Sequence, residues 1–157
     1  MAEEHTSPKR ISPRSLDDYL EVMSKAVFQT GMSWKVVKGK WPDIRAAMEG
    51  FNVGKVARLD ENDLERLVKD KRVIRNRRKL EAIVHNARKM IELDKHYDGF
   101  QDYLRSRHDF DATVRSLRAQ FKFLGEMGCY YFLYVVGEEV PPPRTRSGAL
   151  PADEVER

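Results

Sequence analysis

The spacing of apolar residues constrains this chain more than any other feature, because it follows the period of an α-helix almost everywhere. One helix face is lined by apolar residues that step by four, three and four positions: Leu16, Leu20, Met23 and Val27. The longest amphipathic stretch runs over 80–91. The strict alternation of apolar and polar residues that marks a half-buried strand is missing from the sequence. The pattern therefore predicts an all-α fold, a compact bundle of roughly seven short helices.

Capping residues and prolines place several of the other helices. Pro42 suits the first turn of a helix, so a short second helix is expected over 44–48. Asp60 suits a helix N-cap, with Asp63 at the third helical position. Three further helices are expected over 100–104, over 114–117 and over 127–136, the last being apolar nearly all round and therefore buried.

The two ends of the chain differ in composition from its middle. Residues 1–15 are polar and contain two prolines, which predicts a flexible N-terminal arm. Three consecutive prolines open the segment 141–157, which predicts a flexible tail and leaves 16–140 as one helical domain. No apolar run approaches the length of a membrane span or a secretory signal, so neither is expected. The single cysteine, Cys129, excludes an internal disulfide.

Positive charge is concentrated in one segment. The chain has a net charge of +4, yet the segment 69–79 holds seven basic residues and one acidic residue. A helix N-terminus beside Arg and Lys side chains is a good phosphate site, because free amides, the helix dipole and the side chains act together. The alternative interpretation is a solvated turn with surface charge.

Five segments follow one another in a fixed order that has a known counterpart. They are FQTGMSW at 28–34, FNVGKVA at 51–57, IRNRRKL with NAR at 74–88, GF and YL at 99–104, and FKFLG with CY at 121–130. In this order they resemble segments of the DNA-3-methyladenine glycosylase I family. The resemblance implies a helix-hairpin-helix DNA glycosylase fold. It also implies a function: flipping a damaged base out of double-stranded DNA and cutting its N-glycosidic bond with water, without a cofactor.

The same resemblance assigns roles near the start of the domain. It implies that Trp34 stacks on the extruded base, whereas the residues alone favour a core tryptophan between two helices. The implied base pocket comprises Tyr19, Ala26, Phe28 and Trp34. The implied loop that probes the gap left by the flipped nucleotide contains Gln29, Gly31 and Met32. Met32 would be an apolar wedge, or alternatively a core residue, and Gly31 is expected to supply a backbone-permissive turn.

Contacts to the DNA backbone are implied in two further places. The turn around Gly125 and Gly128 corresponds to one that binds a phosphate through backbone amides, although a simple helix–helix turn would also use glycine. The full set expected to contact the backbone is Arg75, Arg77, Arg78, Lys79, Lys122, Gly125 and Gly128.

Three departures from the family bear on activity. Ala26 stands where the family has its pocket glutamate, and Glu21 lies about 140° around the helix from that position. The family's N-terminal YHDxEWG segment has no counterpart upstream of Leu16. The Cys and His ligands of the family's zinc clamp are also missing, so no structural metal is expected.

Three functions follow as hypotheses, and no catalytic side chain is assigned. The first is a DNA N-glycosylase of base-excision repair that acts on alkylated purines. The second is a non-catalytic homologue that binds damaged or bent DNA, which the loss of the pocket glutamate favours. The third is a protein-interaction module. Neither a membrane nor a nucleotide cofactor is expected, and the expected location is the cytoplasm, with the nucleoid in a bacterium.

Overall fold

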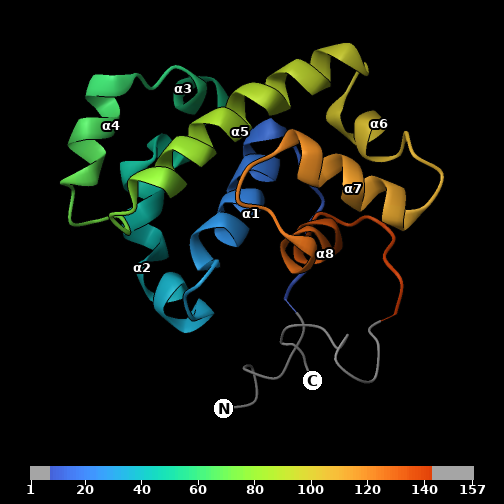
Figure 1. The fold of residues 1–157 in the computed structure, drawn as a ribbon, viewed down its shortest axis with the longest axis horizontal. Helices are drawn as coiled ribbons and strands as arrows, with labels where there is room; N and C mark the ends of the chain where they lie inside the picture. Colours follow the sequence, from blue (N-terminus) through green and yellow to red (C-terminus); the bar gives the residue numbers. More distant parts are fainter. Residues whose placement is uncertain (1–7, 143–157) are drawn as a thin grey trace.

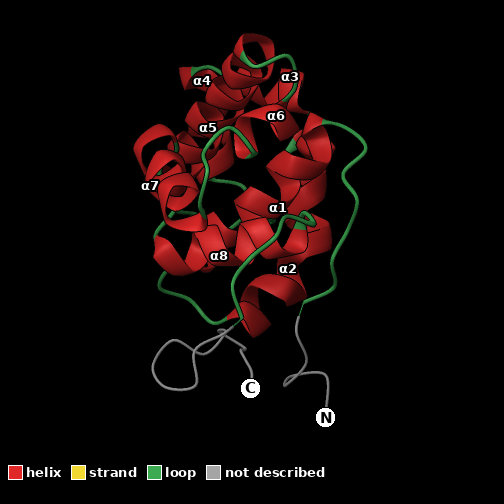
Figure 2. Ribbon diagram, turned by 90° about the vertical axis from the view of Figure 1, so that its right-hand side faces the viewer, coloured by secondary structure: helices red, strands yellow, loops and turns green. Residues whose placement is uncertain are grey.

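The computed structural model describes residues 8–142, and every regular element in that range is a helix (Figures 1 and 2). The all-α prediction is therefore confirmed. In chain order the elements are α1 (Leu16–Gln29), α2 (Trp34–Ala47), the 3-10 turn η2 (Glu49–Phe51), α3 (Val53–Ala57), α4 (Glu61–Val68), α5 (Arg77–His96), α6 (Phe100–Leu104), α7 (Phe110–Gln120) and α8 (Glu126–Val135).

The long helix α5 organises the molecule. It has 20 residues and packs against α1, α3, α4 and α6. Figure 1 shows α2, α3 and α4 on one side of the molecule and α6, α7 and α8 on the other, with α1 between them. Helix α1 contacts α2 and α3 in the first group and α8 in the second, so it connects the two groups of helices through the core.

Side-chain caps explain where several helices begin. Asp60 and Asp63 form a reciprocal capping box at the start of α4, which confirms the predicted N-cap. Ser15, Asn76 and Asp109 accept hydrogen bonds from first-turn amides of α1, α5 and α7. Each cap of this kind stabilises its helix by about 1 kcal/mol.

The second helix differs from its prediction. It begins at Trp34 behind the N-cap Ser33, and Pro42 lies inside it rather than at its start. An internal proline has no N–H and costs about 3 kcal/mol or more. Helix α2 tolerates it because its inner face, including Val37 and Ile44, is buried in the core.

The last helix is buried on one face only. Four of its side chains are buried (Cys129, Phe132, Leu133 and Val135), whereas Met127 in its first turn is 57% exposed. The other expected helices are present as α1, α5, α6 and α7. Helix α3 and the η2 turn had no counterpart among the expected elements, because five and three residues are too few to show a helical period.

The described residues before α1 run along α8. The Ile11 amide donates to the Val135 carbonyl at 2.7 Å, and the Arg10 guanidinium donates to the Glu138 carbonyl at 2.6 Å. The outer parts of the predicted arm and tail lie outside the described residues, so those domain boundaries stay predictions. Within 8–142, no helix combines the length and the hydropathy that crossing a membrane requires.

Candidate functional site

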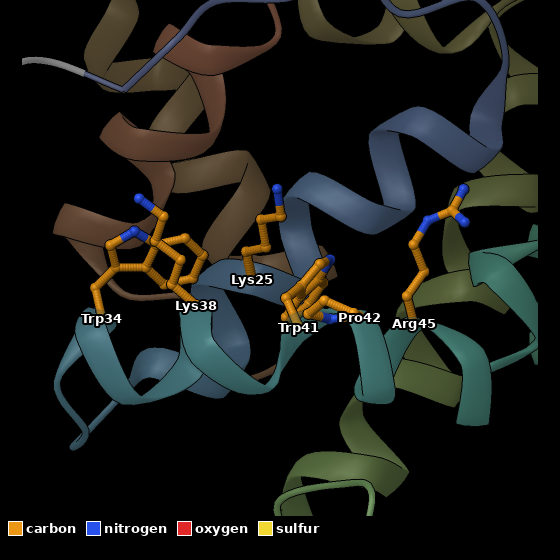
Figure 3. A pocket seen from close by; sticks show the side chains of 6 residues that line it. All are labelled: Lys25, Trp34, Lys38, Trp41, Pro42 and Arg45. Atoms are coloured by element: carbon orange, nitrogen blue, oxygen red, sulfur yellow. The ribbon is translucent and has the colours of Figure 1, made fainter. Parts of the chain in front are cut away.

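A cavity of about 540 Å³ opens between α2 and α1. Four of its lining side chains, Trp34, Lys38, Trp41 and Arg45, follow one another at helical spacing and therefore lie on one face of α2. Pro42 completes that face, and Lys25 enters from α1. Figure 3 shows the five side chains of α2 rising on one side of that helix, with Lys25 of α1 beside them. The cavity thus combines two indoles with three cations, and its volume suits a small molecule or a single nucleotide.

Trp41 is the fixed aromatic of this cavity. Its ring stacks on Phe51, with centroids 5.3 Å apart and an interplanar angle of 4°, and meets the edge of Phe28 at 5.9 Å. Its indole N–H donates to the Glu21 carboxylate at 2.8 Å. Since Trp41 is only 8% exposed, the aromatic surface left for a ligand belongs mainly to the partly buried Trp34.

The charges around the cavity are unevenly paired. The Glu21 carboxylate accepts from Trp41 and from the Arg45 Nε at 3.3 Å. The Lys25 ammonium lies 5.5 Å above the Trp41 ring, and burial lowers the pKa of Lys25 while Glu21 opposes that shift. One carboxylate therefore stands against three cations at this site.

Three of the four expected pocket residues are buried in the core and do not line this cavity. Phe28, Ala26 and Tyr19 are 0%, 4% and 7% exposed, and none lines the cavity. Tyr19 packs on Phe100 at 5.0 Å, and Ala26 faces Gly128 of α8. The reason is helical geometry, because Tyr19 and Ala26 are seven residues apart and share the face of α1 that packs inward. Of the expected set, only Trp34 borders open space.

The loop before Trp34 has the geometry that its glycine suggests. Gly31 has a φ of 77°, a conformation that side chains with a Cβ rarely adopt. The Met32 amide donates to the Gln29 carbonyl at 2.9 Å, which closes the turn. Met32 is partly buried against the core, so its side chain is neither fully free nor fully packed. Its role as a wedge stays a prediction.

Lys79, which was expected to contact the DNA backbone, is buried within the protein. It is 3% exposed, and its ammonium donates to the carbonyls of Phe28 and Thr30, both at 2.7 Å. A lysine so enclosed cannot reach a phosphate. It joins the start of α5 to the end of α1, and so holds the loop that precedes Trp34.

Arg77 is also engaged within the protein. Its guanidinium pairs with the carboxylates of Glu61, Glu65 and Glu81. Three carboxylates neutralise this cation and leave a local negative excess. The basic residues of this segment therefore differ in their surroundings. Arg77 and Lys79 contact protein partners, whereas Arg75 and Arg78 are exposed.

The turn between α7 and α8 is held by α5. The side chain of Asn86 makes two hydrogen bonds with the backbone of Lys122. Its Nδ2 donates to the Lys122 carbonyl at 3.1 Å, and its Oδ1 accepts from the Lys122 N–H at 2.8 Å. Phe123 follows with a φ of 58°, and the Arg78 guanidinium lies 5.9 Å from its ring centroid. Arg78 and the exposed Lys122 are thus brought to the same turn, although 44 positions separate them in sequence.

The two glycines of this turn play different parts. Gly125 is the exposed N-cap of α8 with an extended backbone, and a Cβ there would meet open space. Gly128 packs: a Cβ on it would lie 3.3 Å from a Leu124 methyl and 3.7 Å from the Ala26 Cβ. The structure therefore gives Gly128 a close helix contact, and amide binding of a phosphate at Gly125 stays a prediction.

The expected lack of a metal site stays a prediction for the whole chain. Within residues 8–142, no group of three His, Cys, Asp or Glu side chains is placed to hold a metal ion. Cys129 is fully buried, and burial raises the pKa of its thiol to about 12.

The cavity residues Lys25, Lys38, Trp41 and Arg45 were not expected from the sequence. A signal for them existed, because Ser33 is a good N-cap and Trp34, Lys38, Trp41 and Arg45 are spaced as one helix face. The predicted second helix began only at Pro42, so Trp34, Lys38 and Trp41 were not recognised as members of one helix face. Asn86 lies in the NAR segment that carries the family resemblance, but its contact with Lys122 was not expected, since the two residues are 36 positions apart.

Comparison with known proteins agrees with the resemblance seen in the sequence. The methyladenine glycosylase family model matches residues 13–122. The DNA-3-methyladenine glycosylase 1 of Escherichia coli (strain K12) is 32% identical over 130 residues, which cover 69% of this chain and 70% of the relative. A crystal structure of 3-methyladenine DNA glycosylase I superposes with a TM-score of 0.70 at 26% identity, covering 81% of each chain.

A further solved structure shows the same fold with a ligand. It is a variant of 3-methyladenine DNA glycosylase I in complex with 3-methyladenine, with a TM-score of 0.71 at 23% identity, covering 86% of this chain and 83% of that one. The five sequence segments, the helical architecture and the family match over most of the domain agree. The chain belongs to the methyladenine glycosylase family.

Proposed function

We propose that this protein is a DNA N-glycosylase of base-excision repair that hydrolyses the N-glycosidic bond of a flipped, alkylated purine of the 3-methyladenine type. Its relatives carry the name 3-methyladenine DNA glycosylase. The single observation that carries the proposal is the position of Trp34. This indole borders an open cavity directly after the Gly31 turn, within the segment that most resembles the family.

The substrate is double-stranded DNA, from which the damaged nucleotide is extruded. Extrusion costs a few kcal/mol of stacking and pairing, and the cost is smallest for a damaged base. Stacking on Trp34 returns about 1–3 kcal/mol. Met32, on the loop held by Lys79, is suited to fill the gap left behind.

The chemistry relies on the leaving group. A purine alkylated at N3 is cationic, so when its bond to the sugar breaks, the bonding electron pair neutralises the ring. Water then adds to the sugar carbon and releases a proton to solvent. No side chain of this protein is assigned the role of base or acid, because the position of the family's glutamate is Ala26, whose methyl group can neither accept nor donate a proton.

We infer that the DNA backbone is bound beside the turn between α7 and α8. Arg75, Arg78 and Lys122 are exposed, and two of them meet at Phe123. Lys79 and Arg77 support the site without contacting DNA. Lys79 holds the loop before Trp34, and Arg77 bridges α4 to α5. The same proposal implies a cytoplasmic location, with the nucleoid in a bacterium.

A second function has one specific observation in its favour. Ala26 is packed against α8, so the family's base-reading carboxylate is lost and its place is filled. A protein that keeps the fold, the loop and the basic turn but not this carboxylate is suited to bind damaged DNA without cutting it.

Base release from methylated duplex DNA decides between the two. The glycosylase proposal expects release above the buffer rate. Trp34→Ala should lower it by roughly ten- to a hundredfold, the loss of one stacking contact, while Trp34→Phe should retain part of it. Circular dichroism checks that both variants fold.

Two other results would contradict the glycosylase proposal. Salt-sensitive DNA binding without base release would establish the non-catalytic function. Both DNA functions are wrong if DNA binding is undetectable at low salt, or if detectable binding is not weakened by Arg78→Ala with Lys122→Ala.

A further inference from the structure

Lys25 is the residue that α1 contributes to the cavity, and its side-chain nitrogen is not engaged by the protein. The ammonium lies 5.5 Å from the centroid of the Trp41 ring, and within residues 8–142 it forms no hydrogen bond or ion pair. The nearby carboxylate of Glu21 is already shared by Trp41 and Arg45. In Figure 3 the Lys25 side chain rises between Trp34 on one side and Trp41 on the other. An amine without a protein acceptor therefore stands at the cavity.

The surroundings of Lys25 favour the neutral form of this amine. Its side chain is half-buried, and burial lowers the pKa of the ammonium; Glu21 opposes this shift and Arg45 adds to it. Removal from water and a neighbouring cation are the two ways in which proteins obtain a lysine that attacks carbonyl groups. Lys38 lines the same cavity but is exposed, and Lys79 is engaged by two backbone carbonyls. Lys25 is therefore the lysine here that is suited to be a nucleophile.

The proposed function creates a carbonyl group at the same place. Release of a base leaves a deoxyribose whose C1′ carries a hydroxyl, and opening of the sugar ring turns C1′ into an aldehyde. C1′ was bonded directly to the base, so it lies at the cavity that received the base. An amine held at the cavity and an aldehyde formed there are the two reactants of a Schiff base.

We propose that Lys25 forms a Schiff base with the C1′ aldehyde of an abasic deoxyribose in DNA, and that the protein thereby has a second activity, cleavage of the DNA strand on the 3′ side of the abasic site. The inference rests on the proposed function only for the identity of the aldehyde. It adds a covalent step to a site in which the glycosylase reaction itself uses water.

The step balances with water alone. The neutral amine of Lys25 donates its electron pair to C1′, and the hydroxyl so formed leaves as water, which joins Nζ to C1′ as an imine. A proton on C2′ then passes to water, and the electron pair of that C–H bond forms a C2′–C3′ double bond. The C3′–O bond breaks, and its electron pair leaves with the phosphate. Water finally hydrolyses the imine and returns the lysine, so nothing is oxidised or reduced.

Borohydride trapping tests the Schiff base directly. The substrate is a duplex with one preformed abasic site, made by enzymatic removal of uracil, so no base release by this protein is needed. Borohydride reduces the imine to a stable amine, and a covalent protein–DNA adduct should appear with the wild type. Without borohydride the strand should be cut beside the abasic site. Proteolysis and mass spectrometry should locate the adduct on Lys25.

Two glutamine variants separate Lys25 from lysines in general. Lys25→Gln keeps a polar side chain of similar length and should lose both the adduct and the strand cleavage. Lys40→Gln is the matched control, because the Lys40 ammonium donates to the Lys71 carbonyl at 3.4 Å and does not line the cavity. It should retain both. Binding of the abasic duplex is measured for each variant, and Lys25→Gln should still bind it.

Each result counts for or against the inference. An adduct located on Lys25 together with strand cleavage supports it, and this readout uses the wild type, so it stands even if Lys25→Gln does not fold. The inference is wrong if the wild type gives no adduct, if the adduct lies on another residue such as Lys38, or if the adduct forms without strand cleavage. Release of an alkylated base without an adduct overturns only this inference, whereas an adduct without base release overturns only the glycosylase proposal.

Discussion

Replacing Lys79 by methionine should destabilise the protein far more than a lysine in a charge run would suggest. The ammonium donates to the Phe28 carbonyl, which is buried, and to the Thr30 carbonyl, which is partly buried. Methionine keeps the length and packing of the stem and removes both hydrogen bonds. The change therefore isolates what the ammonium contributes to the end of α1.

The magnitude follows from the two acceptors. A hydrogen bond from a charged donor contributes about 1.5–3 kcal/mol, and a neutral or hydrated one about 0.5–1.5 kcal/mol. Assigning the first range to the Phe28 carbonyl and the second to the Thr30 carbonyl gives a total of about 2–4.5 kcal/mol. Burial lowers the pKa of Lys79, so removing the charge returns part of this free energy and favours the lower half of the range.

Urea unfolding followed by circular dichroism measures the effect. Lys95→Met is the matched control, because Lys95 is exposed on the same helix and should change the free energy of unfolding by less than about 0.5 kcal/mol. Hydrogen exchange should also show faster exchange over residues 29–33, the loop that Lys79 holds. If Lys79→Met loses no more free energy of unfolding than the control, the buried contact of the Lys79 ammonium does not stabilise the protein.

Three further outcomes are expected. Hydrogen bonds from Arg72 lower the pKa of the Asp70 carboxyl to about 2. Because the folded pKa is the depressed one, this contribution is present above a pH of about 4 and lost as the pH falls toward 2, so urea midpoints of wild type and Asp70→Asn should converge there. Their difference at neutral pH should be small, since the pair is exposed. The Cys129 thiol, buried and with its pKa raised to about 12, should react with a disulfide reagent only after unfolding. In DNA binding, Arg78→Ala should reduce the slope of log K against log salt by about 0.9, whereas Arg77→Ala should leave it unchanged because Arg77 faces three carboxylates.

The sequence predicted the fold well because helical signals are local. The capping box of Asp60 and Asp63 and the long face of α5 each depend on residues within a few turns of one another. The predicted start of the second helix at Pro42 was wrong for a physical reason. Proline is favoured in a first turn and costly inside a helix, but the buried inner face of α2 outweighs that cost, and tertiary packing of this kind cannot be seen in local spacing.

The site was harder to predict because the type of a residue does not determine where its side chain points. Arg77, Arg78 and Lys79 are consecutive and similar, yet one faces carboxylates, one lies over Phe123 and one is buried under α1. About 100° of helix rotation separates each from the next, so one charge run serves three environments. Only the partners, which lie elsewhere in the chain, decide which of these cations stays exposed to solvent.

The two faces of α1 explain how this family member can differ in chemistry while keeping the fold. Ala26 lies on the face that packs against α8, where a Cβ on Gly128 would be 3.7 Å away, so a carboxylate at this position would have to be buried. Glu21 and Lys25 lie on another face, where the carboxylate is occupied by Trp41 and Arg45. On the proposed function, cleavage by this protein depends on the lability of the lesion itself and on stacking against Trp34. Its rates on different lesions should follow how readily each base leaves unaided, and a protein that read the base through a carboxylate would break that order.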